Sequence, residues 1–274
     1  MTTPTLDLNN GVSIPQLGFG VFQVPPKDTA DIVTQALDVG YRHIDTALAY
    51  HNEQGVGEAI ASSSLSRDDV FVTTKLWNYD QGTDAAFKAF DASLERLGFD
   101  VLDLYLIHWP APQQDRYVDT WKAFEQLYAD GRIRAIGVSN FRVEDLQRLL
   151  DLGLTVPVVN QIELHPYLTQ DELRIFHDKH EIVTEAWSPI AQGAVLDDPV
   201  ITELARAKDA TPAQVVIAWH LALGNVVIPK SVTPDRIAEN FASTEVELAG
   251  DEIDAISALN RNERTGPDPW EFPG

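Results

Sequence analysis

Short apolar runs rich in β-branched residues alternate along nearly the whole chain with longer segments in which apolar residues have helical spacing. Four consecutive runs end near positions 45, 75, 108 and 139, at intervals of 30, 33 and 31 residues. Intervals of this size are typical of repeated strand–helix units, in which parallel strands are covered by helices. The alternation therefore predicts an α/β fold built on a parallel sheet.

Eight strands are predicted, at residues 17–22, 43–47, 70–76, 101–108, 135–139, 158–164, 182–187 and 226–228. Helical spacing occurs at residues 27–39, 84–97, 118–129, 143–152, 169–179, 212–223 and 234–241. Residues 5–14 contain the turn Asn9-Asn10-Gly11 and predict an N-terminal β-hairpin, and a short tail follows the last helix. We expect one domain over residues 1–274, a (β/α)8 TIM barrel.

An open doubly wound sheet is the alternative fold. It is expected to carry the phosphate-binding pattern G-x-G-x-x-G after its first strand. Gly18-Phe-Gly20 is followed by Val21-Phe22-Gln23, and Gly55-Val-Gly57 is followed by Ile60 at the last position of the pattern. Both candidates fail, which favours the closed barrel.

The charge and composition of the chain disfavour several classes of protein. Twenty Lys and Arg residues oppose 42 Asp and Glu residues, which gives a net charge of −22 and disfavours binding to nucleic acid. The chain has no cysteine, so it has no disulfide or thiolate nucleophile, and no metal site is expected. No signal peptide or membrane-spanning run is visible, so we expect a cytoplasmic protein without membrane contacts. The acidity indicates either a well-solvated surface or adaptation to high salt.

Polar residues stand at the ends of three neighbouring predicted strands, where the catalytic groups of barrels lie. The second strand ends at Asp45, with Tyr50 in the following loop, and the next two strands deliver Lys75 and His108. Singly, each residue has an ordinary structural explanation, such as helix capping or solvation. Lys75, however, follows a run without other charges, so its ammonium is predicted to be buried and paired with Asp45. Together these residues predict a catalytic site.

The four side chains suit proton donation to a carbonyl oxygen. A phenol with its usual pKa of about 10 is a poor acid near neutrality. A nearby ammonium is expected to lower the pKa of Tyr50, with a carboxylate holding the ammonium in place. A neutral imidazole can orient the same substrate oxygen. Such a site provides a proton but no hydride, so a bound cofactor must be the reductant.

The second half of the predicted barrel offers a cleft for that cofactor. Trp187 offers a flat face for a planar ring, and the residues suited to grip a carboxamide are Ser139, Asn140, Asn160 and Gln161. The eighth strand is followed by Lys230 and Ser231, and then by a helix that bears Arg236. Cations and a hydroxyl at a helix start are typical of a phosphate site, although an ordinary capped surface helix is the alternative.

Six sequence blocks together resemble the aldo-keto reductase superfamily, in particular short bacterial members of the 2,5-diketo-D-gluconate reductase type. The blocks are Gly40-Tyr-Arg-His-Ile-Asp45-Thr-Ala, Thr74-Lys75-Leu-Trp77, Leu106-Ile-His108-Trp-Pro110, Gly137-Val-Ser-Asn-Phe141, Asn160-Gln-Ile-Glu-Leu-His165-Pro, and Ile228-Pro-Lys-Ser231 with Arg236 and Glu239-Asn240. They span nearly the whole chain, and their order and spacing are specific.

The resemblance implies NADPH-dependent reduction of aldehydes and ketones, with weaker use of NADH, by a monomer. It implies Tyr50 as general acid, tuned by Lys75 and Asp45, with His108 orienting the carbonyl. The nicotinamide carboxamide is then expected on Ser139, Asn140 and Gln161, and its ring against Trp187. The 2′-phosphate is expected on Lys230, Ser231 and Arg236, and the adenine on Glu239 and Asn240. Further cofactor contacts are expected from Ser188, Ile190, Gln192 and Val232.

The substrate pocket is the feature least determined by the resemblance. Phe22, Trp77 and Trp109 are its predicted walls, and small carbonyls, dicarbonyls and keto sugars are the expected substrates. Trp270 and Phe272 in the tail either close the pocket or anchor the chain end. Two other functions stay open: an aldolase or lyase that forms a Schiff base on Lys75, and a non-catalytic NADPH-binding sensor or regulatory barrel.

Overall fold

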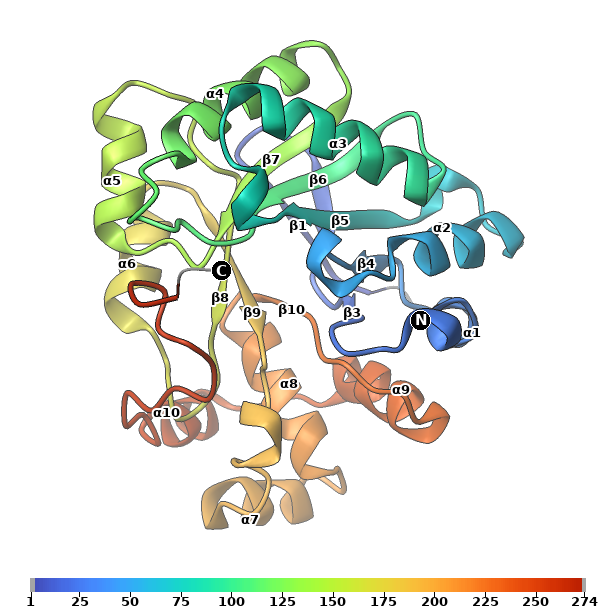
Figure 1. The fold of residues 1–274 in the computed structure, drawn as a ribbon. Coiled ribbons are helices and arrows are strands. Elements are labelled where there is room, and N and C mark those ends of the chain that lie inside the picture. The colour runs from blue at the N-terminus through green and yellow to red at the C-terminus, as the bar shows by residue number, and fades with distance from the viewer. Residues whose placement is uncertain (1–2, 273–274) are drawn as a thin grey trace.

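The computed structural model describes residues 3–272. Eight parallel strands lie at its centre and helices surround them (Figure 1). In spatial order the strands are β10-β9-β8-β7-β6-β5-β4-β3. Their bounds are β3 Phe19–Gly20, β4 His43–Asp45, β5 Phe71–Leu76, β6 Leu102–Ile107, β7 Ile133–Ser139, β8 Val159–Glu163, β9 Val183–Trp187 and β10 Val226–Val227.

Backbone contacts between the first and last strands close the barrel. Leu17 forms a parallel bridge with Val227, and the amide of Gly18 donates to the carbonyl of Val227 at 2.9 Å. Farther along, the amide of Gly20 donates to the carbonyl of Pro229 at 3.1 Å. A methyl group on Gly20 would lie 3.0 Å from the carbonyl oxygen of Ile228, so a side chain here would crowd this seam. The predicted (β/α)8 fold is confirmed.

The helices are α1 Pro26–Val39, α2 Glu53–Ser62, α3 Thr83–Leu97, α4 Tyr117–Ala129, α5 Val143–Asp151, α6 Asp171–Lys179, α7 Pro199–Ala207, α8 Pro212–Ala222, α9 Pro234–Phe241 and α10 Gly250–Ser257. Short 3₁₀ turns are η1 Leu48–Tyr50, η2 Arg67–Asp69, η3 Asn78–Asp80, η4 Ala191–Gly193 and η5 Ala242–Glu245. The sequence patterns predict seven of the helices and miss α2, α7 and α10. No helix within residues 3–272 has the length and apolar character needed to cross a membrane.

The predicted N-terminal hairpin is confirmed and fills one end of the barrel. Strands β1 Thr5–Asp7 and β2 Ser13–Pro15 pair antiparallel, with Leu6 opposite Ile14. Buried Leu8 and Ile14 pack with barrel residues such as Leu104 and Val226 in an apolar cluster. Apolar side chains therefore seal this end of the barrel. Because the strands are parallel, their carboxyl ends and the polar residues there lie together at the other end.

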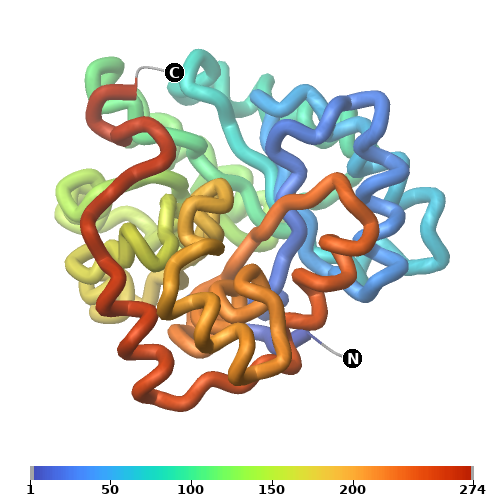
Figure 2. Tube along the Cα trace, turned by 90° about the horizontal axis from the view of Figure 1, so that it is seen from below, coloured from blue at the N-terminus to red at the C-terminus, as the bar shows by residue number. Residues whose placement is uncertain are grey.

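The chain beyond α10 folds back over the barrel. Figure 2 shows this C-terminal segment running along one side of the molecule, past segments from the middle of the chain. We call residues 264–272 the C-terminal strap. It contacts Glu163 of β8, and Trp270 lies on the guanidinium of Arg142. The strap therefore lies beside the strand ends where the predicted site residues are.

Candidate active site

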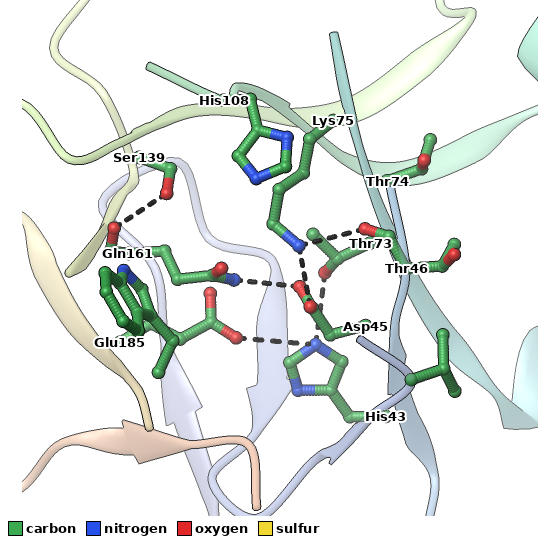
Figure 3. A network of polar contacts seen from close by, with 12 residues as sticks. His43, Asp45, Thr46, Thr73, Thr74, Lys75, His108, Ser139, Gln161 and Glu185 are labelled. Carbon is green, nitrogen blue, oxygen red and sulfur yellow. Dashed lines mark hydrogen bonds and ion pairs between the residues drawn. The ribbon is translucent and has the colours of Figure 1, made fainter. Parts of the chain in front are cut away.

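The structure brings the four predicted catalytic residues together at the carboxyl ends of β4, β5 and β6. Asp45 ends β4, Lys75 lies on β5, His108 follows β6, and Tyr50 ends η1. Lys75 Nζ donates to Asp45 Oδ1 at 2.6 Å and to the carbonyl of Thr46 at 2.9 Å (Figure 3). Both charged side chains are buried, Lys75 completely. The predicted buried ion pair is confirmed.

Tyr50 and His108 lie against this pair. Lys75 Nζ is 5.1 Å from the centroid of the Tyr50 ring, and the Tyr50 and His108 rings meet edge to face at 5.7 Å. Trp77 also packs edge to face with His108, with 5.1 Å between the ring centroids. The phenol, the ammonium and the imidazole thus surround one point at the mouth of the barrel.

The pKa shifts of these groups follow from their burial. Burial raises the pKa of Tyr50, and the Lys75 charge offsets only part of that rise. The predicted lowering of the Tyr50 pKa is therefore wrong, because burial destabilises the phenolate more than the Lys75 ammonium stabilises it. Burial alone lowers the pKa of Lys75, but the charges of Asp45 and Tyr50 bring it above its usual value. Burial and the Lys75 charge hold the pKa of His108 well below its usual range, so the imidazole is neutral.

A fifth ionisable side chain, Glu185 on β9, lies in the same buried network and was not predicted. Its Oε1 is 3.7 Å from His43 Nε2 (Figure 3). Burial and the neighbouring Asp45 charge raise the pKa of Glu185 to about 8, so it holds a proton at neutral pH. A carboxyl within the otherwise uncharged run Ile182-Val-Thr-Glu-Ala-Trp187 is the sequence signal that could have found it.

Three of the residues predicted to grip a carboxamide also meet at this mouth. Ser139 Oγ donates to the Gln161 carbonyl at 2.8 Å, and Asn140 Nδ2 donates to the His108 carbonyl at 3.0 Å. Gln161 Nε2 donates to Asp45 Oδ2 at 2.8 Å, so this amide also supports the Asp45–Lys75 pair. Trp187 Nε1 donates to Asn140 Oδ1 at 2.9 Å. These contacts join the predicted catalytic residues to the predicted cofactor residues.

The predicted phosphate site lies at the start of α9. Lys230, Val232 and Arg236 are exposed, and within residues 3–272 neither cation has an ion-pair partner. Ser231 is mostly buried, and its Oγ accepts from the amide of Thr233 at 3.1 Å. Both cations are therefore exposed close together in sequence at the start of one helix, with a hydroxyl between them. They make this end of α9 suited to an anionic group.

The remaining predicted cofactor residues flank this region. Glu239 Oε1 accepts from Thr211 Oγ1 at 2.7 Å, and Asn240 is mostly buried. Ser188 and Ile190 are partly exposed in the loop after β9, whereas Gln192 is exposed and donates from Nε2 to the carbonyl of Thr265 at 3.3 Å. Gln192 therefore also contacts the C-terminal strap.

Aromatic rings gather where the substrate pocket is predicted. Phe22 is 56% exposed and packs on Tyr50, with 5.1 Å between the ring centroids. Phe272 lies over Trp109 at 4.5 Å and Trp77 at 6.2 Å, so this strap residue covers the pocket wall. Trp270, stacked on Arg142 at 4.1 Å, anchors the strap instead. The two tail aromatics thus have different contacts, Phe272 with the predicted pocket residues and Trp270 with Arg142.

A closed (β/α)8 barrel with ionisable groups at the carboxyl ends of its strands defines a class of barrel enzymes. Within that class, residues 16–261 match the model of the aldo/keto reductase family. The chain is 57% identical to an aldo-keto reductase of Mycolicibacterium smegmatis, covering 98% of each chain. It is 50% identical to the methylglyoxal reductase DkgA of Salmonella typhimurium, covering 100% of each chain.

Solved structures agree with these relatives. The crystal structure of a mutant of Gox0644 in complex with NADPH is 47% identical, with a TM-score of 0.94 over 98% of each chain. The protein belongs to the aldo/keto reductase family and is an oxidoreductase.

Proposed function

We propose that the protein reduces aldehydes and ketones to alcohols with NADPH, and that Tyr50 donates the proton. The observation that carries this proposal is the buried Asp45–Lys75 pair, with 2.6 Å between Nζ and Oδ1, packed against the Tyr50 ring beside a neutral His108. Support also comes from the family and from relatives named methylglyoxal reductase. We further propose that the chain acts as a single domain and as a monomer on small carbonyl compounds.

The residues present fit NADPH. Lys230 and Arg236 offer exposed, unpaired charges for the 2′-phosphate, with Ser231 and Val232 between them, and Glu239 and Asn240 lie farther along α9 for the adenine. Ser139, Asn140 and Gln161 are assigned to the carboxamide and Trp187 to the nicotinamide ring, with Ser188, Ile190 and Gln192 in the adjoining loop. The backbone φ of Ser188 is 48° and that of Gln192 is 54°, and such left-handed residues cluster at ligand clamps. The bound NADPH would supply the hydride.

The chain's own residues then handle the proton and the substrate oxygen. His108, neutral because it is buried beside Lys75, can hydrogen-bond the carbonyl oxygen and hold it near the Tyr50 hydroxyl. Tyr50 gives its proton to that oxygen as negative charge develops there. Lys75 stabilises the phenolate that remains, because its ammonium is fixed by Asp45 and by the Thr46 carbonyl. Asp45 is held in turn by Gln161.

The pocket walls favour small or medium carbonyls. Trp77, Trp109, Phe22 and Phe272 present apolar ring surface around His108 and Tyr50. Such walls accept aldehydes and dicarbonyls through apolar contact, with few groups that select a particular polar substituent. Methylglyoxal and phenylglyoxal are therefore suitable first substrates, with keto sugars next.

The Schiff-base alternative does not suit Lys75. A nucleophilic lysine needs a lowered pKa, so that its amine is neutral. The charges of Asp45 and Tyr50 raise the pKa of Lys75, and its donors already serve Asp45 and Thr46. The sensor alternative predicts NADPH binding without turnover.

The test is NADPH oxidation with methylglyoxal, phenylglyoxal and a keto sugar, repeated with NADH. We expect turnover with all or some of these carbonyls and a clear preference for NADPH. Bound NADPH without turnover, seen as quenched tryptophan fluorescence, would contradict the reductase and support the sensor. Absence of both binding and turnover would overturn the assignment of the cofactor.

A further inference from the structure

Two different parts of the chain hold the two ends of the Trp187 indole. Its Nε1 donates to Asn140 Oδ1 at 2.9 Å. At the far edge of the ring, a methyl group added to Gly266 would lie 2.4 Å from Cη2 and 2.9 Å from Cζ3. Such distances are far below van der Waals contact, so the indole occupies the space that a side chain at position 266 would need. The barrel therefore fixes one end of the ring and the C-terminal strap fixes the other.

The strap is held at this point by one buried carboxylate. Glu163 Oε1 accepts from the amide of Thr265 at 2.6 Å, from Thr265 Oγ1 at 2.7 Å and from the amide of Gly266 at 3.1 Å. His165 Nε2 is 3.1 Å from the same oxygen. Glu163 is fully buried and lies directly opposite Trp187 in the β8–β9 register. The hydrogen bonds thus place Gly266 beside the indole.

Two weaker contacts hold the same stretch. Arg264 Nη1 lies 3.6 Å from Glu163 Oε2, and Gln192 Nε2 reaches the Thr265 carbonyl at 3.3 Å. Thr265 is therefore held from β8 on one side and from the loop after β9 on the other.

We propose that Glu163 is a positioning residue, which fixes the strap so that Gly266 sets the orientation of the Trp187 ring. The inference rests on the proposed function, in which the nicotinamide stacks on that ring. Glu163 acts through the strap and through Trp187, and it touches neither the substrate nor the reacting atoms. The contacts named involve Nε1 at one end of the ring and Cη2 and Cζ3 at the other, and the nicotinamide is assigned to a face of the ring between them.

The same strap also covers the substrate side of the site. Phe272 packs on Trp109, which itself contacts Trp187 at 6.5 Å between ring centroids. A cavity of about 430 Å³ beside the strap is lined by Asn140, Glu163 and Arg264 among others, which leaves space for the strap to shift. Loss of the Glu163 contacts is therefore expected to move the Trp187 ring without unfolding the barrel.

Gly266→Ala tests the contact directly, because the φ of Gly266 lies outside the left-handed region and an alanine there acts by its methyl group. The first readout needs no cofactor: the indole N–H resonance of Trp187 in a two-dimensional NMR spectrum. The second is the Kd for NADPH from fluorescence quenching. We expect a shifted resonance and binding weakened about tenfold, or ~1.4 kcal/mol. Gly250→Ala, where a methyl group meets open space, is the matched control and is expected to change neither readout.

A double mutant separates the contact from a general disturbance. In a Trp187→Phe background the ring no longer reaches position 266, so Gly266→Ala is expected to change the Kd less than about twofold. Glu163→Gln, which keeps the size but removes the charge, is also expected to shift the Trp187 resonance, because it weakens the hydrogen bonds that hold Thr265 and Gly266.

An unchanged Trp187 resonance and an unchanged Kd in Gly266→Ala would overturn the inference. Equal losses of binding in the two backgrounds would also overturn it. Failure of the wild-type protein to bind NADPH would refute the proposed cofactor instead, and the resonance would still report whether the strap positions the ring.

Discussion

Lys75→Met tests the description of the site as a buried, charge-paired centre. The substitution keeps the length of the side chain and removes the ammonium, which leaves the Asp45 carboxylate buried without its partner. Breaking a buried pair in this way costs about 3–5 kcal/mol. Each kcal/mol lowers the Tm of a domain of this size by about 2–4 °C. The expected loss is therefore roughly 6–20 °C.

The companion variant Asp45→Asn/Lys75→Met removes both charges. It is expected to regain most of the lost Tm, because a neutral amide needs no counter-ion and Gln161 can still hydrogen-bond it. Lys122→Met is the matched control, since Lys122 forms an exposed pair with Asp119 at 3.6 Å, and it is expected to change stability by less than about 1 kcal/mol.

Thermal unfolding followed by circular dichroism at neutral pH measures all three variants, with urea unfolding as a second measure of the free energy. A Lys75→Met protein as stable as the wild type would refute the reasoning, because a buried, unpaired Asp45 cannot be without cost. A double mutant no more stable than Lys75→Met would show that the loss comes from packing and not from charge.

Three further predictions follow from the same structure. Glu185 has a folded-state pKa of about 8 against an ordinary 4.5, so folding binds a proton between these pH values and stability falls as the pH rises across that window. Glu185→Gln is expected to have a higher Tm than the wild type at pH 8 and a smaller advantage toward pH 5. Parallel curves of Tm against pH for the two proteins would contradict this. Arg236→Ala is expected to weaken the binding of NADPH about 10–100-fold in a fluorescence titration and that of NADH less than twofold, because only NADPH carries the 2′-phosphate. An equal effect on the binding of both cofactors would place Arg236 outside the phosphate site. Phe272→Ala is expected to raise the KM for phenylglyoxal and leave the Kd for NADPH unchanged, since the ring covers Trp77 and Trp109; an unchanged KM would show that the ring does not contact the substrate.

The barrel could be predicted because its physical cause repeats along the sequence. Each buried parallel strand reads as an apolar run, and each is followed by an amphipathic helix. Helices α7 and α10 lie outside this repeat, since α7 is an additional helix between β9 and β10 and α10 follows the last strand unit. Helix α2 contains Gly55 and Gly57, which lower helix propensity. A side chain at Gly57 would lie 2.1 Å from the carbonyl oxygen of Leu97, so close packing explains this glycine.

The cluster of candidate catalytic residues at the strand ends could also be predicted from the sequence. An isolated charge at the end of an apolar strand must find a partner, and the adjacent strand offers Asp45 to Lys75. The direction of the Tyr50 pKa shift could not be predicted from the sequence, because it depends on how deeply the phenol is buried. The contact between the strap and Glu163 could not be predicted either, because Thr265 and Glu163 are 102 positions apart and no local pattern relates them.

The most direct test of the account is a comparison of wild type and Tyr50→Phe, with NADPH oxidation and NADPH binding measured on the same samples. The phenol hydroxyl is assigned to the substrate oxygen and not to the cofactor. We therefore predict that Tyr50→Phe loses nearly all reduction of methylglyoxal while its Kd for NADPH stays within about twofold of the wild type. Undiminished reduction in Tyr50→Phe would contradict the assignment of the proton donor.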